Sequence, residues 1–418
     1  MKGNKQYLLY SKVHQRKRLR SAWRVVRESG MSSKSAETKK LVENFSHDSE
    51  NYIENIYRQL LNKKFKFTPA HGVLQKRAGK DPRPIVISTL GDRIVRRSIL
   101  DVIQEQDSVK PFYENECSFG GIRKRGVKQA IEAVLVAIRD GAGYYLCSDI
   151  QNFFMNIPRH KVLAILHSMC PDPMFNELLD DATKTELINI HQIKRKDLFP
   201  THTIGVAQGC CLSPLIGNIL LNAFDKQMNE RSIRCIRFID DFIILGKRPS
   251  HLGKAFLNAQ KNLSELGLRA YDPYQNSPKA STGMVQNGFE FLGCEIIPGL
   301  LRPSTKSRQR LLARIEGILK ESFSVMSCPA KTLEEKRSFI QSLMDVHHTI
   351  MGWGNQYSFC NDYQILEQMD TQIHQIIQRF IKGYAKRVKD MDPKDRRRIF
   401  GVHCLIDSKR RPVLPLSC

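Results

Sequence analysis

The sequence predicts an α+β fold, because short runs of β-branched and aromatic residues occur beside long segments whose apolar residues recur at helical spacing. The clearest strand-like pattern spans residues 237–246, where the adjacent carboxylates of Asp240 and Asp241 separate two short hydrophobic runs. That pattern is typical of a β-hairpin with the acids at its tip. The clearest helical pattern spans residues 362–384, whose apolar stripe we expect to lie in a core.

A third acid follows another predicted strand. Residues 144–148 have the composition of a strand that ends at Asp149, which could complete a carboxylate cluster with Asp240 and Asp241. Hard oxygen ligands of this kind suit Mg²⁺, and two such ions can stabilise both the attacking and the leaving oxygen of a phosphoryl displacement. An ordinary turn is the alternative interpretation, since Asp is common in turns for its own hydrogen bonds to the backbone.

A loop-like segment, residues 207–218, lies between the two acidic sites. Its Gln208-Gly209 pair, a Ser-Pro pair and an Asn suit a loop that enters an apolar helix running through Phe224. Taken alone, this pattern indicates an ordinary loop and helix start. Further helices are predicted over residues 11–29, 49–61, 127–139 and 253–266, and the first of these is strongly basic.

In order and spacing these three segments resemble the palm of a reverse transcriptase, and further motifs extend the resemblance to group II intron-like enzymes along most of the chain. The segments that carry this wider resemblance are 19–26, Phe67-Thr68-Pro69, Lys76, Gly79-Lys80, Arg83-Pro84-Ile85, 118–131, 288–293 and 351–357. The resemblance implies a right-hand polymerase with antiparallel sheet in the fingers and palm, a helical thumb and a basic helical N-terminal extension. The implied parts are an extension at 1–62, fingers at 63–140, a palm at 141–300, and a thumb with a basic tail at 301–418.

Three groups of site residues follow from the resemblance. The expected catalytic acids, which would also bind two Mg²⁺ ions, are Asp149, Asp240 and Asp241. The residues expected to bind the incoming deoxynucleoside triphosphate are Lys76, Arg83, Phe154, Gln208 and Gly209. The residues expected to position the primer end are Phe291, Leu292 and Gly293. The spacing of Lys76 and Arg83 could place both on one hairpin, although either could be an ordinary surface charge.

Phe154 bears on which sugar the enzyme accepts. It lies five residues after Asp149, where the resemblance places an aromatic side chain that blocks a 2′-hydroxyl group. RNA-making polymerases with such a palm usually carry a small or acidic residue there, so Phe154 disfavours an RNA-dependent RNA polymerase. A core role competes with this interpretation, since Phe153 is also aromatic and one of the two rings must face inwards.

The composition agrees with a nucleic-acid-binding enzyme. The chain has 66 Lys and Arg against 42 Asp and Glu, a formal net charge of +24 that favours a polyanionic partner. Its 41% of hydrophobic residues are enough for packed cores, which excludes a disordered basic protein. The sequence contains no stretch of about 18 apolar residues and no leader-like start, so we expect no membrane partner and a cytoplasmic location. The cysteines lack zinc-site spacing and are expected to be reduced.

Three departures from the intron-type pattern indicate a separate branch. Met155 stands where many relatives have Asp, Phe238-Ile239 replaces the Tyr-Ala pair common in intron-encoded enzymes, and residues 31–34 replace a Gly-Asp sequence. No zinc-ligand cluster or recognisable endonuclease follows the thumb motif. The chain is therefore similar to standalone defence-associated bacterial reverse transcriptases, which copy a partner noncoding RNA to resist phage.

The resulting expectation is an RNA-directed DNA polymerase that copies a bound partner noncoding RNA into cDNA by two-metal-ion nucleotidyl transfer in anti-phage defence. The alternative is an RNA-binding maturase or scaffold of a group II intron-like element. The basic charge and the thumb do not separate these two functions. The three acids favour an enzyme, because a pure binder has no reason to cluster acids that face nucleic acid. The template, the primer and the oligomeric state stay open.

Overall fold

A computed structural model describes residues 8–33, 35–77, 80–201, 203–229, 233–275, 277–329, 332, 335 and 337–408. Lys34 and Gly79, which the sequence motifs include, lie outside the described residues. The chain divides into two compact units, Met1–Met284 and Val285–Cys418. Both units combine helices with antiparallel sheet, which confirms the α+β class. The unit boundary falls inside the predicted palm, and the division into four parts stays a prediction.

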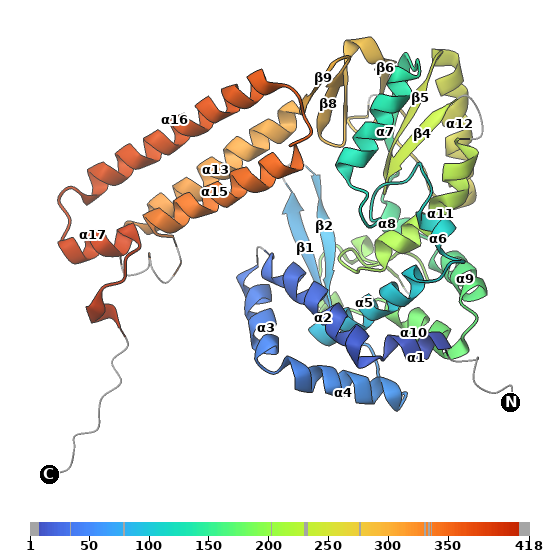
Figure 1. Ribbon diagram of the computed structural model, residues 1–418, viewed down its shortest axis with the longest axis horizontal. Coiled ribbons are helices and arrows are strands. Elements are labelled where there is room, and N and C mark those ends of the chain that lie inside the picture. The colour runs from blue at the N-terminus through green and yellow to red at the C-terminus, as the bar shows by residue number, and fades with distance from the viewer. Residues whose placement is uncertain are drawn as a thin grey trace. The chain divides into compact units, whose positions relative to one another are not determined.

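The described part of unit 1 begins with four helices, and the first two divide the basic segment that was expected to form one helix over residues 11–29 (Figure 1). They are α1 (Leu8–Val13), α2 (Arg16–Met31), α3 (Ala36–His47) and α4 (Ser49–Leu61). Helix α2 buries Leu19, Trp23 and Val26 and packs on α5 (Leu90–Gln104). Its basic face is partly neutralised, because Arg16 and Arg20 form ion pairs of 2.8 and 2.7 Å with glutamates of α4.

Unit 1 contains two antiparallel sheets. The first is a hairpin of β1 (His71–Arg77) and β2 (Lys80–Ile87). The second has the strand order β4-β5-β3-β6, with β4 (Arg234–Phe238), β5 (Asp241–Gly246), β3 (Tyr144–Asp149) and β6 (Ser281–Met284). Phe238 pairs with Asp241 across a two-residue turn, so the hairpin expected around Asp240 and Asp241 is confirmed.

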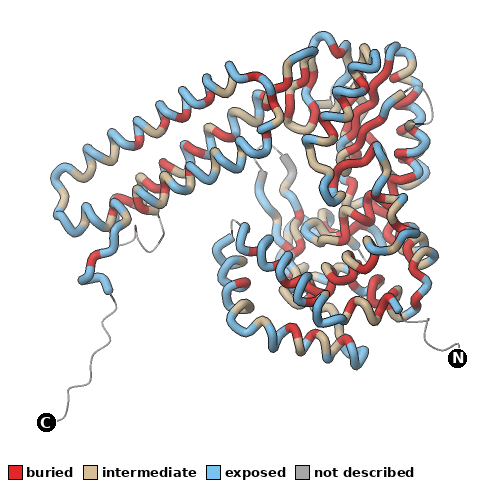
Figure 2. Tube along the Cα trace, in the orientation of Figure 1, coloured by how far each residue is buried: buried red, intermediate tan, exposed pale blue. Residues whose placement is uncertain are grey.

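Helices cover the four-stranded sheet of unit 1. Helix α7 (Val127–Arg139) packs on β4 and β5, and α12 (Pro249–Glu265) packs on β5 and β3. Neighbouring β5 residues Phe242 and Ile243 are both fully buried, so both faces of the strand are covered, as the red core strands in Figure 2 show. The remaining helices of this unit are α6 (Lys110–Tyr113), α8 (Phe153–Asn156), α9 (Arg159–Met169), α10 (Pro173–Thr183) and α11 (Ser213–Gln227).

Unit 2 joins a small sheet to a group of helices. Strands β7 (Phe289–Phe291), β8 (Cys294–Ile297) and β9 (Leu300–Pro303) form an antiparallel sheet in that order. Among its described residues, the helices are α13 (Thr305–Val325), α15 (Phe339–Gln356), α16 (Tyr363–Val388) and α17 (Pro393–Phe400). The apolar stripe predicted over residues 362–384 is confirmed as core, since Met369, Ile373 and Phe380 of α16 are buried. Among the described residues, no helix combines the length and apolar character needed to cross a bilayer.

Candidate active site

The three predicted acids meet at one edge of the four-stranded sheet. Asp149, the last residue of β3, lies directly opposite Asp241, the first residue of β5. Side chains directly opposite each other on neighbouring antiparallel strands share a face, with Cβ atoms about 5 Å apart. Asp240 lies in the turn between β4 and β5, and the Ile150 N–H donates to its carbonyl oxygen at 2.9 Å. The end of β3 and the tip of the β4–β5 hairpin are therefore joined at the acids.

The electrostatics of this edge indicate a need for positive charge. Burial and the neighbouring Asp149 carboxylate raise the pKa of Asp240 to about 6, while Lys279 and Arg83 act in the opposite direction. Lys279 Nζ lies 3.0 Å from Asp149 Oδ2 and 4.5 Å from the centre of the Tyr271 ring. Lys279 was not predicted as a site residue, because nothing in the local sequence around it indicates contact with an acid 130 positions earlier.

The acids supply the kind of oxygen ligands that Mg²⁺ uses, although they do not form a complete cage. Among the residues that the structure describes, no three His, Cys, Asp or Glu side chains form a group that could hold a metal ion. Mg²⁺ in nucleotide-transfer sites is usually held by one or two carboxylates, with waters and substrate phosphates completing its shell. Asp149 and Asp240, whose charges interact, fit that requirement, and Asp241 lies exposed on the strand beside Asp149.

A loop bearing two of the predicted nucleotide-binding residues is attached to the β1–β2 hairpin. Arg83 Nε donates to Gln208 Oε1 at 2.7 Å, and the Val86 N–H donates to the Gln208 carbonyl oxygen at 3.0 Å. Gly209 has a φ of +107°, and a Cβ there would lie 3.2 Å from the Val86 carbonyl oxygen. The structure thus brings Arg83, Gln208 and Gly209 together, and Arg83 is also close enough to affect the pKa of Asp240.

Lys76 lies on the same hairpin as Arg83, but no residue of β2 is paired directly opposite it. Gln75 lies opposite Arg83, Arg77 lies opposite Lys80, and the register shifts between Gln75 and Arg77. Lys76 is exposed at this irregularity. The expected placement of Lys76 and Arg83 on one hairpin is therefore observed, while their contact with a triphosphate stays a prediction.

The two aromatic residues after Asp149 have different environments. Phe153 is 2% exposed, and a Cβ at Gly217 of α11 would lie 2.8 Å from its ring. Phe154 is half-buried, with its ring centre 5.3 Å from that of Phe153. Its carbonyl oxygen accepts the Val206 N–H at 2.8 Å, which ties it to the start of the loop carrying Gln208. Phe153 is thus the core ring of the pair.

The predicted primer-grip residues belong to unit 2. Phe291 is buried at the end of β7, and Leu292 and Gly293 form the two-residue turn to β8, with φ values of +49° and +78°. The Ser304 N–H donates to the Gly293 carbonyl oxygen at 2.8 Å. A Cβ at Gly293 would lie 2.9 Å from Tyr357 Oη, so glycine is needed there for both backbone conformation and space.

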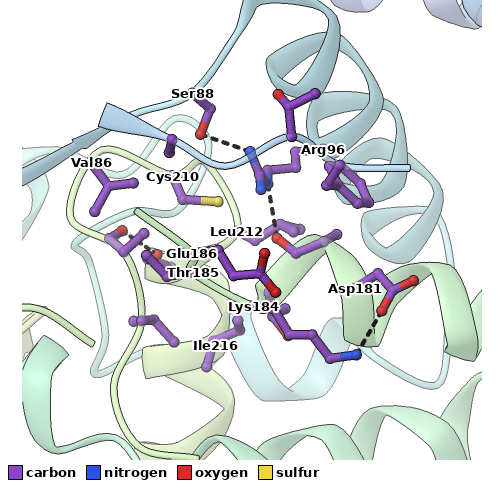
Figure 3. Close-up of a pocket in the computed structure, with 18 of the residues that line it drawn as sticks. Val86, Ser88, Arg96, Asp181, Lys184, Thr185, Glu186, Cys210, Leu212 and Ile216 are labelled. Carbon is purple, nitrogen blue, oxygen red and sulfur yellow. Dashed lines mark hydrogen bonds and ion pairs between the residues drawn. The ribbon is translucent and has the colours of Figure 1, made fainter. Parts of the chain in front are cut away.

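A cavity of about 240 Å³ adjoins the same loop, but the three acids do not line it. Its walls come from β2, α5, the end of α10 and the start of α11, and the loop contributes Ala207 and Cys210 (Figure 3). Arg96 crosses it, donating to Ser88 Oγ and to the Ala182 carbonyl oxygen, both at 2.8 Å. The cavity is therefore lined by residues on either side of Gln208 and Gly209, and it is separate from the predicted catalytic acids.

Comparison with known proteins identifies the family. Residues 74–296 match the family model described as reverse transcriptase (RNA-dependent DNA polymerase). Protein YkfC of Escherichia coli K12 is 24% identical over 57% of this chain and 69% of its own length. The group II intron-encoded protein LtrA of Lactococcus lactis is 24% identical over 47% of this chain, which spans only 31% of LtrA.

A solved partial Cas6-RT-Cas1–Cas2 complex aligns over 62% of this chain and 42% of the solved chain, with 22% identity and a TM-score of 0.37. The similarity to LtrA confirms the coarser resemblance to group II intron-like reverse transcriptases. The family model covers more than half of the chain. The chain therefore belongs to the reverse transcriptase family, that of the RNA-dependent DNA polymerases.

Proposed function

We propose that this protein copies a bound RNA into cDNA by nucleotidyl transfer at Asp149, Asp240 and Asp241. The observation that carries the proposal is the meeting of these acids at the edge of one sheet, with Asp149 directly opposite Asp241. When bound, two Mg²⁺ ions would lower the pKa of the primer 3′-hydroxyl group and neutralise charge on the triphosphate as pyrophosphate departs. The acids would hold these ions, and a bound cation would offset the burial and the Asp149 charge that raise the pKa of Asp240.

The residues around the acids have separate roles in the proposal. Arg83 and Lys76 contact the triphosphate from the β1–β2 hairpin, and the Arg83–Gln208 hydrogen bond couples that hairpin to the nucleotide loop. Phe154 excludes a 2′-hydroxyl group, a role that its half-buried position permits because Phe153 fills the core. Phe291, Leu292 and Gly293 in unit 2 position the primer end.

The biological setting that we propose is anti-phage defence with a dedicated noncoding RNA as template. The formal net charge of +24 supports a nucleic-acid partner through counterion release. The departures from the intron-type pattern at Met155 and Phe238-Ile239 favour a branch distinct from mobile introns. A second candidate is an RNA-binding maturase or scaffold, which the similarity to an intron-encoded protein favours.

Sequencing of the RNA and DNA that copurify with wild type and with Asp240→Asn tests these proposals. We expect one discrete RNA with both proteins and complementary DNA with wild type alone. RNA with both and DNA with neither, in cells with and without phage, would support the maturase or scaffold function instead. A wild type that retains no RNA would contradict both functions.

Sugar selection has its own test in Phe154→Val, with Phe153→Val as the matched control. We expect Phe154→Val to incorporate ribonucleotides more readily, because the smaller side chain leaves space for a 2′-hydroxyl group. Phe153→Val should lower stability by about 1–3 kcal/mol through lost core packing, with sugar discrimination unchanged. Equal sugar discrimination in wild type and Phe154→Val would contradict the assigned role.

A further inference from the structure

Arg237 is a fully buried arginine in the strand that leads to the acid hairpin. It is 0% exposed, in the middle of β4, three positions before Asp240. A buried guanidinium requires partners for its charge and for its donors. Asp225 of α11, itself 2% exposed, accepts from Arg237 Nε at 2.7 Å and from Nη2 at 2.6 Å. This bidentate ion pair links α11 to β4, the first strand of the acid hairpin.

The other donors of Arg237 reach the turn and its surroundings. Nη1 donates to the Ile239 carbonyl oxygen at 2.8 Å and to Asn218 Oδ1 at 3.0 Å, while Nη2 donates to Ser118 Oγ at 2.9 Å. The Ile239 carbonyl belongs to the peptide group whose nitrogen is that of Asp240. Arg237 therefore binds the backbone that carries the central acid of the site.

The segment around Gly120 also packs against the Ile239-Asp240 turn. Asn218 Nδ2 donates to the Gly120 carbonyl oxygen at 2.9 Å, and a Cβ at Gly120 would lie only 2.7 Å from the Ile239 nitrogen. The backbone next to Gly120 pairs with Arg237, because the Phe119 N–H donates to the Arg237 carbonyl oxygen at 3.0 Å. The turn is thus enclosed by α11, β4 and residues 117–121.

The conformation of the turn explains why such support is needed. Ile239 has a φ of +61°, the left-handed region that a β-branched residue strongly disfavours. Residues in such conformations persist where the surrounding structure over-determines them, and they concentrate at functional sites. The hydrogen bond from Arg237 to the Ile239 carbonyl oxygen supplies part of that restraint, and Gly120 lies so close to Ile239 that no side chain would fit between them.

We propose that Arg237 is a positioning residue for nucleotide addition, which, together with Asp225, Asn218 and Ser118, holds the Asp240 carboxylate in place beside Asp149. This inference rests on the proposed function, because it assigns the buried ion pair a role in the same site. Arg237 acts through Asp240 and does not itself contact substrate. A purely structural ion pair would stabilise the fold without setting the rate of the reaction.

The test compares Arg237→Lys and Asp225→Asn with Asp172→Asn. Asp172 is a matched control, since it is 1% exposed in the same unit and accepts the N–H groups of Leu9 and Tyr10 at 2.9 Å, away from the acids. RNA-templated nucleotide addition and binding of Mn²⁺ by electron paramagnetic resonance are measured below the melting temperature of each variant. Arg237→Lys and Asp225→Asn should lower kcat about 100-fold, the scale of a small misplacement of a reacting group. Their KM for the nucleotide should change little, and Mn²⁺ binding should weaken.

The control separates positioning from folding. Asp172→Asn should lower the melting temperature and leave kcat and Mn²⁺ affinity at wild-type values. If Arg237→Lys and Asp225→Asn also keep wild-type kcat and Mn²⁺ affinity, the inference is wrong. Should either variant fail to fold, Asn218→Ala provides the milder test, because it removes one partner of Arg237 and retains the ion pair. A smaller fall in kcat, about tenfold, is expected there, and an unchanged kcat would overturn the inference.

The metal measurement separates this inference from the proposed function. A wild type that makes no DNA on any RNA would contradict the proposed function, yet its Mn²⁺ affinity can still be compared with that of Arg237→Lys. Equal Mn²⁺ affinities would then overturn the positioning role, and weaker binding by Arg237→Lys would support it. An active wild type with a fully active Arg237→Lys would contradict the inference alone.

Discussion

Two hairpin turns, one in each unit, both place a large apolar residue in a disfavoured backbone conformation and stabilise it by different means. The turn at Ile239-Asp240 in unit 1 and the turn at Leu292-Gly293 in unit 2 both contain two residues between paired strands. Each places a large apolar residue in the left-handed region, Ile239 at φ +61° and Leu292 at φ +49°. The two turns differ in what makes this conformation acceptable.

The unit 2 turn is stabilised mostly by the glycine within it and by a hydrogen bond from a residue shortly after it in the sequence. Gly293 adopts its positive φ without a Cβ penalty, and the Ser304 N–H binds its carbonyl oxygen. The unit 1 turn relies on Arg237, Asn218 and Gly120, which come from three separate segments of the chain. Substitutions far along the chain should therefore disturb the acid turn, whereas the unit 2 turn should respond mainly to changes within it.

Of the changes that test this comparison of the two turns, Gly120→Ala is expected to have the largest effect. The added methyl group would lie 2.7 Å from the Ile239 nitrogen and would displace the acid turn. We expect kcat for RNA-templated DNA synthesis to fall about 100-fold. Gly143→Ala is the control, because a Cβ at Gly143 meets no atom within 4 Å, and its kcat should match wild type. A fully active Gly120→Ala would show that the position of the Ile239-Asp240 turn does not depend on the segment around Gly120.

A smaller effect is expected from Lys279→Met at the acid edge. Lys279 neutralises Asp149 across 3.0 Å and would compete with Mg²⁺ for that carboxylate. Because the pair is partly exposed, its removal should lower the half-saturating Mg²⁺ concentration for synthesis only about three- to tenfold. Lys254→Met, at an exposed position of α12, should leave the Mg²⁺ requirement unchanged. An unchanged requirement in Lys279→Met would mean that the ion pair does not compete with the metal.

The third prediction concerns the stability of the metal-free protein and its pH dependence. The pKa of Asp240 is about 6, above its ordinary value of 3.8, so the unfolded chain loses this proton first as the pH rises. Wild type should therefore lose stability between about pH 4 and pH 6, and Asp240→Asn should avoid that loss. In urea unfolding we expect Asp240→Asn to be more stable by about 1–2 kcal/mol at pH 7.5 and equal to wild type at pH 4. A variant less stable than wild type at pH 7.5 would contradict the raised pKa.

The smallest effect is expected from Leu292→Asn in the unit 2 turn. Asn tolerates the left-handed conformation better than Leu, and Asn-Gly is the favoured pair for a turn with two positive φ values. Unit 2 should gain about 0.5–1 kcal/mol, measured from the fluorescence of Trp353 during urea unfolding in a Trp23→Phe background. If Leu292 also positions the primer, the same variant should extend primers more slowly. A Leu292→Asn variant less stable than wild type would show that the packing of the Leu292 side chain contributes more than the backbone preference of Asn.

The sequence predicted the parts of the fold that depend on local patterns. Helices α4 and α7 span Ser49–Leu61 and Val127–Arg139, as expected, because their apolar spacing and end signals lie within each segment. The acid hairpin was equally predictable from its two short runs of β-branched and aromatic residues on either side of the paired acids. In the predicted fingers, residues 63–140, the strands end at Ile87, and helices α5, α6 and α7 follow with loops between them.

Features created by contacts between distant segments could not be predicted from local sequence patterns. Arg237 was part of the predicted hairpin, yet its partners at Asp225, Asn218 and Ser118 become visible only when the strand and helix pack. Lys279 likewise reaches Asp149 from a loop with no motif of its own. The acids could be predicted because the family motif marks them, whereas the residues that hold and neutralise them carry no such local signal.

Asp149 and Asp240 are proposed above to carry out RNA-templated DNA synthesis. Its most direct test is extension of a DNA primer on an RNA template with Mg²⁺ and deoxynucleoside triphosphates. Wild type, Asp149→Asn and Asp240→Asn are compared, with RNA affinity measured in parallel. We expect complementary DNA from wild type, no detectable extension by either variant, and similar RNA affinity for all three. Extension by both variants at the wild-type rate would contradict it.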